Sequence, residues 1–263
     1  MKRDKVKEPT ARAARTYSVP ALDKGIDIIE LLAGERNGLL ISEIAYRLKR
    51  SISEIFRIVI TLEQRDWLQK DRESSRYGIT YRMMELAHRG TPAQAMSLVA
   101  APVLSQLSRQ IEQSCHIVVP AGGHGLVVLR QENAGHPGGF AMRLGAVVDL
   151  LASCGGHVLL AFMEPAELEI HFRQVPTPWP MRKAELLRRL ARVRKQGYEM
   201  QRSHLSASVT EISYPIHGRD ARVVAALTVP YLPPNGRSSS LAQMRGSIAE
   251  AAQQISSTLA AIR

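Results

Sequence analysis

Few of the residues that could carry out chemistry in this chain are spaced for catalysis. Eight histidines and two cysteines are present, but pairs such as His116 and His124 lack the spacing of helical or loop zinc sites. The glycine-rich stretch at residues 122–125 lacks the Lys-Ser/Thr order of a phosphate-binding loop, and no Gly-x-Ser-x-Gly motif occurs. We therefore expect no enzymatic activity, no bound metal and no cofactor.

The clearest candidate for a ligand contact is the run of small residues Ser153-Cys154-Gly155-Gly156. Small side chains let a ligand approach the backbone, and the N–H groups at a helix N-terminus attract anions. The run therefore predicts a position for the carboxylate of a small ligand, and the alternative is a simple helix cap. A lone cysteine such as Cys154 is more often a small buried residue than a reactive thiol.

Composition limits the class of protein and its partners. The 263 residues include 35 Lys and Arg against 24 Asp and Glu, a net charge of +11, and 45% are hydrophobic. This apolar content excludes a disordered chain. The basic balance favours nucleic acid as a partner, although many soluble proteins are simply basic. No apolar run approaches the roughly 20 residues that span a bilayer, and the N-terminus lacks a signal-peptide core. We expect a cytoplasmic protein that does not contact the membrane.

The elements that would position a nucleic-acid contact lie in the first 80 residues. Apolar residues at helical spacing predict a helix over 18–36, and Ser42 is a suitable N-cap for a helix over 43–48. A third helix is expected after Ser51, where Ser51 and Glu54 have the spacing of a capping box. Strand-like residues at 67–70 and 77–80 flank a polar turn and predict a hairpin. This order is that of a winged helix-turn-helix, which places a helix in the DNA major groove. The alternative is a three-helix bundle with no nucleic-acid role.

Motifs in both halves of the chain match one family. They are Val19-Pro20-Ala21-Leu22-Asp23-Lys24-Gly25-Ile26, Ile41-Ser42-Glu43-Ile44-Ala45 and Leu62-Glu63-Gln64-Arg65-Asp66-Trp67-Leu68 in the N-terminal part, and Gly156, Leu160, Ala161, Gly197-Tyr198 and Ile212-Ser213-Tyr214-Pro215-Ile216 in the C-terminal part. Over roughly residues 18–261 the chain resembles an IclR-type transcriptional regulator.

The resemblance implies an α+β fold with four segments. These are a flexible basic arm over 1–17, a winged helix-turn-helix DNA-binding domain over 18–80, a linker helix over 81–98 that residues 90–92 interrupt, and a GAF-like α/β effector-binding domain over 99–263. Within the last segment, the sequence indicates strands over 117–120, 126–130, 212–217 and 223–229, and helices over 103–111, 157–162, 183–195 and 241–262.

The resemblance also implies which residues meet double-stranded DNA. They are Ser42, Arg50, Ser51, Ile52, Ser53, Glu54 and Arg57, with Arg76 from the hairpin on a phosphate. The family commonly has Pro-Lys-Ser-Thr where this chain has Ser51-Ile52-Ser53-Glu54, so a basic residue is lost and an acid is gained. Arg57 has an alternative role as an intramolecular partner of Glu54.

Carried over position by position, the family's effector pocket corresponds to Leu144, Cys154, Gly155, Gln201, Val209 and Glu211. If Glu211 lines that pocket, it would repel a carboxylate and favour a ligand with hydroxyl or amine donors. The alternative places Glu211 in solvent at the start of a strand.

The implied function is a ligand-responsive bacterial regulator whose affinity for operator DNA changes when a small organic molecule, acidic or aromatic, binds. The resemblance implies a homodimer that could pair into a tetramer, with Leu22, Ile26 and Leu98 contributing. The alternative function is a small-molecule sensor with weak or sequence-blind DNA binding.

Overall fold

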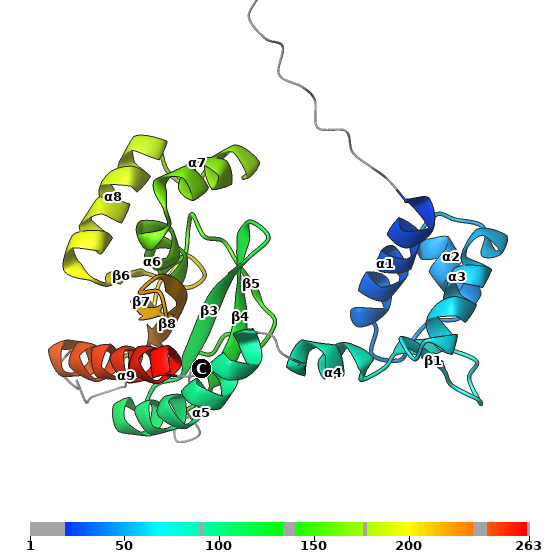
Figure 1. Ribbon diagram of the computed structural model, residues 1–263, viewed down its shortest axis with the longest axis horizontal. Coiled ribbons are helices and arrows are strands. Elements are labelled where there is room, and N and C mark those ends of the chain that lie inside the picture. Colours follow the sequence, from blue (N-terminus) through cyan, green and yellow to red (C-terminus); the bar gives the residue numbers. More distant parts are fainter. Residues whose placement is uncertain (1–18, 90–91, 134–139, 176–177, 234–240, 262–263) are drawn as a thin grey trace, which may run out of the picture. The chain divides into compact units, whose positions relative to one another are not determined.

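The computed structural model describes residues 19–89, 92–133, 140–175, 178–233 and 241–261 (Figure 1). Contacts within the chain divide it into two compact units, residues 1–89 and 90–263. The predicted arm over residues 1–17 lies outside the described residues. No helix among the described residues is long and apolar enough to cross a membrane.

The N-terminal unit is a winged helix-turn-helix, as predicted. Five of its core side chains expose at most 1% of their surface: Ile28, Leu32, Ile44, Ile55 and Val59. Burying each such side chain stabilises the unit by roughly 1.5–3 kcal/mol. In chain order its elements are α1 (Pro20–Ala33), α2 (Ile41–Arg47), α3 (Ile52–Gln64), β1 (Leu68–Lys70), β2 (Tyr77–Ile79) and α4 (Arg82–His88).

The wing is joined to the helices by a short bridge. The backbone of Leu39, just before α2, exchanges two hydrogen bonds with Tyr77 of β2, at 2.9 and 2.7 Å. Gly38 has a φ of +62°, and a Cβ there would lie 2.6 Å from the Tyr77 carbonyl oxygen. Only glycine allows this close approach of the two segments.

The sequence predicted an N-terminal cap for each of α2 and α3, and only the one at α3 is correct. The capping box at α3 is confirmed: the Glu54 N–H donates to Ser51 Oγ (3.3 Å), and the Ser51 N–H donates to Glu54 Oε2 (3.0 Å). The expected N-cap role of Ser42 is wrong. Helix α2 begins at Ile41, because the Glu43 carboxylate accepts the Leu40 N–H at 2.8 Å. Ser42 lies in the first turn and is exposed.

The C-terminal unit has an antiparallel six-stranded sheet in the order β5-β4-β3-β8-β7-β6. Helices α5 and α9 pack on one face of it, and α6, α7 and α8 lie over the other (Figure 1). The elements are α5 (Pro92–Ile111), β3 (Cys115–Ala121), β4 (His124–Gln131), β5 (Val147–Val148), α6 (Cys154–Phe162), α7 (Pro165–Gln174), α8 (Lys183–Gln196), β6 (Glu199–Arg202), β7 (Thr210–His217), β8 (Val223–Tyr231) and α9 (Leu241–Ala261).

Several elements differ from the sequence expectation. Elements β5, β6 and α7 were not predicted, and α5 starts eleven residues before the expected helix over 103–111. The predicted linker over 81–98 contains α4 and the first turns of α5, so it is two helices. Strand β6, Glu-Met-Gln-Arg, lacks the apolar alternation that marks a strand. The reason is that its inward-facing residues, Glu199 and Gln201, are polar.

Candidate functional site

The outward face of α3 is the candidate DNA-reading face, defined here by Ile52, Ser53, Phe56 and Arg57. Ile55 and Val59 of the same helix are fully buried in the core, so the 3.6-residue period turns these four residues outward. Arg57 is exposed and has no ion-pair partner among the described residues. The same holds for Arg50, in the turn between α2 and α3. These two guanidinium groups are available for an anionic partner.

Glu54 stabilises the N-terminus of α3 and is not part of the candidate DNA-reading face. Its carboxylate accepts the Ser51 N–H and also pairs with Lys24 Nζ at 3.0 Å. The Ser51 backbone hydrogen bond, followed by the contacts with Lys24 and the Ser51 hydroxyl, lowers the pKa of Glu54 to about 2. The alternative pairing of Glu54 with Arg57 is wrong, because Lys24 of α1 is the cation that meets this carboxylate. The acid gained at the helix start is therefore neutralised within the domain.

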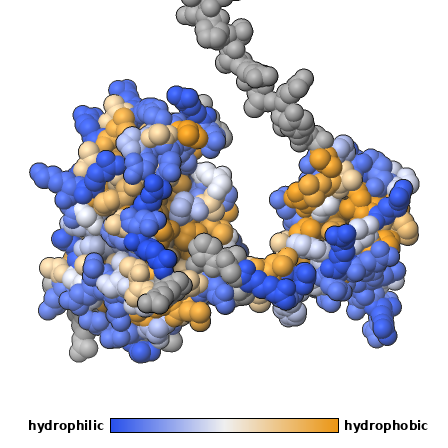
Figure 2. Space-filling view, viewed as in Figure 1, coloured by the Kyte–Doolittle hydropathy of each residue, from blue (hydrophilic) through white to orange (hydrophobic). Residues whose placement is uncertain are grey.

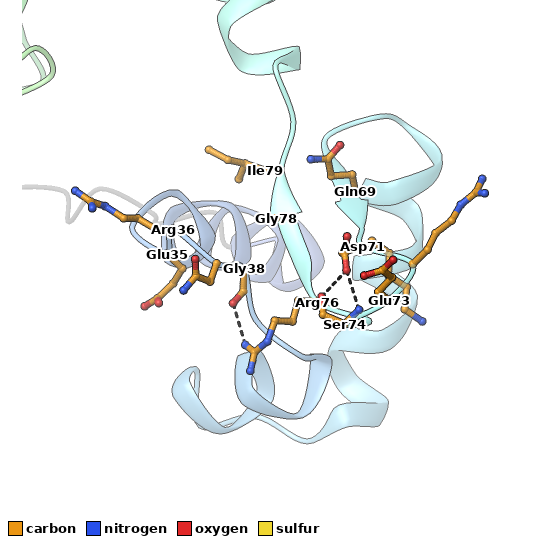
Figure 3. A pocket seen from close by; sticks show the side chains of 13 residues that line it. Glu35, Arg36, Gly38, Gln69, Asp71, Glu73, Ser74, Arg76, Gly78 and Ile79 are labelled. Carbon is orange, nitrogen blue, oxygen red and sulfur yellow. Dashed lines mark hydrogen bonds between the residues drawn. The ribbon is translucent and has the colours of Figure 1, made fainter.

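Arg76 is held by its own domain. Its guanidinium donates to both Glu43 carboxylate oxygens, at 2.7 and 3.1 Å, and to the Gly38 carbonyl oxygen at 3.0 Å. The Leu40 N–H and then Arg76 lower the pKa of the Glu43 carboxyl. Arg76 lines an open groove of about 680 Å³ between the wing and the loop before α2. Figure 3 shows its side chain beside the Gly38 carbonyl. A phosphate contact by Arg76 would compete with this bidentate pair.

The sequence reasoning missed two exposed aromatic residues near the candidate DNA-reading face. Phe56 of α3 is 50% exposed, and Tyr46 of α2 is 84% exposed. Ile52, which was predicted, is 47% exposed and stands four residues before Phe56, so the two occupy adjacent positions on the helix surface. The helical period of α3, which turns Ile55 and Val59 into the core, could have identified Phe56.

The C-terminal unit contains a buried row of polar side chains on one face of its sheet. Residues opposite one another in antiparallel strands project from the same face. The register aligns His116 with Thr228, Thr228 with Ser213, and Ser213 with Glu199, across strands β3, β8, β7 and β6. Each of these four side chains, the polar row, is at most 5% exposed. Helix α6 lies over the row: a Cβ at Gly155 would be 3.0 Å from Thr228 Oγ1. Gly155 therefore allows close helix–sheet packing.

Next to the polar row, Glu211 occupies the N-terminus of α6. Its Oε2 accepts the Cys154 N–H at 3.2 Å, and its Oε1 accepts the Ser203 hydroxyl at 2.7 Å. Glu211 is only 6% exposed, so the alternative that placed it in solvent is wrong. Its register partner Gln201 accepts from Arg189 at 2.7 Å and donates to the Ala152 carbonyl oxygen at 2.9 Å.

A second buried carboxylate faces α6 from the end of the polar row. Glu199 Oε2 lies 3.5 Å from His157 Nδ1, and both residues are at most 1% exposed. Burial raises the pKa of Glu199, but His157, the Met200 N–H and Arg189 together outweigh it, so the net pKa is lowered. The buried His116 Nδ1, on the same sheet face, has no hydrogen-bond partner among the described residues. Unpaired buried polar atoms are costly and mark functional sites.

Cys154 is structural in this arrangement. Its thiol donates to the backbone carbonyl oxygens of Glu199 and Glu211, at 3.3 and 3.4 Å. Burial, then the negative charges of Glu211 and Glu199, raises the pKa of the thiol well above its usual value. The expectation of a small buried residue is confirmed. No group of three His, Cys, Asp or Glu residues able to hold a metal occurs among the described residues.

The structure brings together five of the six residues predicted to bind the effector. Cys154, Gly155, Gln201 and Glu211 surround the start of α6, and the buried Val209 accepts the N–H of Ser203, whose hydroxyl contacts Glu211. Leu144 is not part of this group. It is 62% exposed and precedes Gly145, which bonds to β4, whereas Gln201 and Glu211 lie on β6 and β7 at the other end of the sheet order.

Comparison with known proteins assigns both units. The IclR helix-turn-helix domain matches residues 21–72, and the bacterial transcriptional regulator IclR C-terminal domain matches residues 93–257. The chain is 24% identical over 246 residues to the HTH-type transcriptional regulator XynR of Escherichia coli, covering 92% of this chain and 97% of the relative.

Solved structures agree with the fold. An IclR homologue from Microbacterium hydrocarbonoxydans complexed with 4-hydroxybenzoate has a TM-score of 0.79 at 23% identity, covering 92% of this chain and all of that one. The Thermotoga maritima IclR structure has a TM-score of 0.69 at 22% identity, covering 91% and 98%. The expected family and fold are confirmed. The chain belongs to the IclR family, and it is a DNA-binding transcriptional regulator with an effector-binding domain, not an enzyme.

Proposed function

We propose that this chain regulates transcription in the cytoplasm by changing its affinity for operator DNA when a small organic molecule binds beside α6. The observation that carries the proposal is the buried polar face under α6, where His116 Nδ1 has no hydrogen-bond partner in the described part of the chain and Glu199 Oε2 faces His157 Nδ1 at 3.5 Å. A buried polar face with an unpaired atom is costly for stability alone, and recognition of a ligand accounts for it. The relative that was crystallised with 4-hydroxybenzoate supports a small organic effector.

In the N-terminal unit, α3 is the proposed reading helix. Arg50 and Arg57 supply cations for phosphate or base edges, and Ser53 supplies a hydroxyl. Ile52 and Phe56 present apolar surface of the kind that contacts thymine methyl groups in the major groove. Ser51 and Glu54 hold the start of the helix, Ser42 stands exposed on α2, and Arg76 positions the wing through Glu43.

We further propose that the regulator acts as a dimer, because one winged helix-turn-helix domain contacts only a few base pairs. Leu22 and Ile26 of α1 are 60% and 45% exposed, and Leu98 of α5 is 73% exposed. Figure 2 shows apolar surface on the N-terminal unit where α1 lies. Light scattering at micromolar concentration should give at least twice the 29.1 kDa chain mass. A monomer at that concentration would refute the proposed dimer.

Fluorescence anisotropy with the DNA upstream of the chain's own gene tests the function. A regulator binds tightly and with sequence preference, and its affinity falls steeply with salt. A thermal-shift screen of small organic compounds identifies molecules that bind the folded protein. Each such molecule is then added to the DNA titration, where coupling of roughly 1–3 kcal/mol shifts affinity about 5–150-fold. A DNA affinity that falls steeply with salt but does not depend on sequence, and that no stabilising compound changes, would favour a small-molecule sensor without an operator.

A further inference from the structure

Two glutamates are buried where the N-terminus of α6 meets the sheet. Glu199 and Glu211 stand on adjacent strands, at most 6% exposed, and project from the same sheet face toward α6. On this face Glu199 Oε2 lies 3.5 Å from His157 Nδ1, and the buried His116 Nδ1 has no hydrogen-bond partner within the residues that the structure describes. Burying two carboxylates costs free energy even when each has partners, so their presence together is unusual for packing alone.

Glu211 takes the place of an anionic ligand. The first turn of α6 carries the partial positive charge of a helix N-terminus. The Cys154 N–H donates to Glu211 Oε2, and the Gly156 N–H donates to the Ser153 hydroxyl at 3.0 Å. The anion-binding groups of this turn are therefore largely occupied from within the chain. A second carboxylate arriving there would meet Glu211 at close range in a medium that screens charge weakly.

We propose that Glu211 determines the specificity of the effector site: it fills the carboxylate position at α6, so the site selects a ligand with hydroxyl or amine donors and excludes carboxylates. This inference rests on the proposed function, because it concerns the same site. Each carboxylate oxygen has two lone pairs, and Glu211 uses one on each oxygen. The remaining lone pairs of Glu211 accept hydrogen bonds from such donors.

Removing the Glu211 side chain should create a carboxylate site. The test compares full-length wild type, Glu211→Ala and Glu211→Gln by thermal unfolding in sodium acetate and in sodium chloride of equal ionic strength. In Glu211→Ala, acetate enters the vacated space and accepts the Cys154 N–H. At about 100 times its Kd, acetate should raise Tm by roughly 5–10 °C over chloride. Wild type and Glu211→Gln, whose space stays filled, should show no difference between the two salts.

An exposed glutamate provides the control for net charge. Glu185 of α8 is exposed, and its substitution Glu185→Ala removes one charge at the surface. This variant should respond equally to acetate and chloride. If Glu211→Ala is unfolded in chloride, recovery of its folded fraction in acetate is the readout. Equal behaviour of Glu211→Ala in the two salts, folded or unfolded, would overturn the inference, as would selective stabilisation of wild type by acetate.

Matched ligands test the same inference on the unaltered protein. The probes are 4-hydroxybenzoate and 4-hydroxybenzyl alcohol, which share a phenol and differ in the carboxylate. Stabilisation of wild type by the carboxylate and not by the alcohol would overturn the inference, whereas the reverse supports it. None of these measurements contains DNA. Loss of the proposed function, seen as DNA affinity that no ligand changes, is therefore distinguishable from failure of the specificity assignment.

Discussion

The two units of this regulator use glutamate in opposite ways. In the N-terminal unit, Glu54 keeps 41% of its side chain exposed and pairs with Lys24 at the surface. In the C-terminal unit, Glu199 is 1% exposed and faces His157, with Arg189 Nε 3.8 Å away. Water screens the first pair, whereas burial strengthens the interactions of the second and raises the cost of breaking them.

This difference matches what each unit has to recognise. The DNA-reading unit neutralises its acids Glu43 and Glu54 internally and leaves the cations Arg50 and Arg57 exposed, which suits a polyanion. The effector unit keeps the acids Glu199 and Glu211 in its interior, where we propose that Glu211 discriminates between small molecules. The residue type alone therefore does not decide its role; its burial and its partners do.

The largest expected effect comes from removing the buried acid. Glu199→Ala leaves His157 and Arg189 without their carboxylate, and it should lower the free energy of unfolding of the C-terminal unit by about 3–5 kcal/mol. Urea unfolding followed by Trp179 fluorescence in a Trp67→Phe background measures this, since the chain has two tryptophans. Glu54→Ala should cost the N-terminal unit far less. Equal losses in the two variants would remove the distinction between the units.

Acid should weaken the C-terminal unit through His116. Burial lowers the pKa of His116 to about 4, against an ordinary value of 6.5. Between these two values His116 is protonated in the unfolded chain but not in the folded chain. The free energy of unfolding therefore falls as pH drops from about 6.5 towards 4. Between about pH 7 and pH 5 the loss is about 2 kcal/mol from this residue. His116→Gln should flatten the pH dependence of unfolding over this window. A slope identical to that of wild type would contradict the assignment.

Two arginines in the N-terminal unit should behave differently on DNA. Arg57→Ala should weaken operator binding roughly tenfold and reduce the salt slope by about one, because its guanidinium is free to contact DNA. Arg76→Ala should leave the salt slope unchanged, since Glu43 already pairs with this guanidinium. Anisotropy titrations over a salt series compare the two. A flatter dependence of DNA affinity on salt for Arg76→Ala would show that Arg76 contacts a phosphate, as the sequence predicted.

The smallest expected effect concerns the apolar part of the candidate DNA-reading face. Replacing a contacted thymine by uracil removes one methyl group and should cost about 0.8 kcal/mol, close to fourfold in Kd. In Phe56→Ala the same replacement at the position that Phe56 contacts should cost nothing further. A panel of operators with single uracil substitutions, titrated with both proteins, measures this coupling. Equal penalties for the two proteins at every position would exclude a thymine contact by Phe56.

The sequence predicted the elements whose signals are local. The Ser51–Glu54 capping box and the hairpin follow from spacings within a few residues, and the structure has both of them. The motifs in both halves identified the family correctly. Local rules failed at β6, whose inward residues Glu199 and Gln201 are polar, and at Ser42, where the Glu43 carboxylate rather than a serine hydroxyl marks the start of the helix.

Only the tertiary structure decided which partners the charged and polar residues meet. Arg76 pairs with Glu43, 33 positions away, and Glu211 reaches Cys154 across 57 positions. The polar row draws its members from four strands between residues 116 and 228. Strand register and helix packing bring these groups together, and neither is encoded in the spacing of neighbouring residues. The sequence by itself therefore determined the family and the winged helix-turn-helix order. The fold decided that a glutamate of the chain itself, Glu211, accepts the Cys154 N–H at the start of α6.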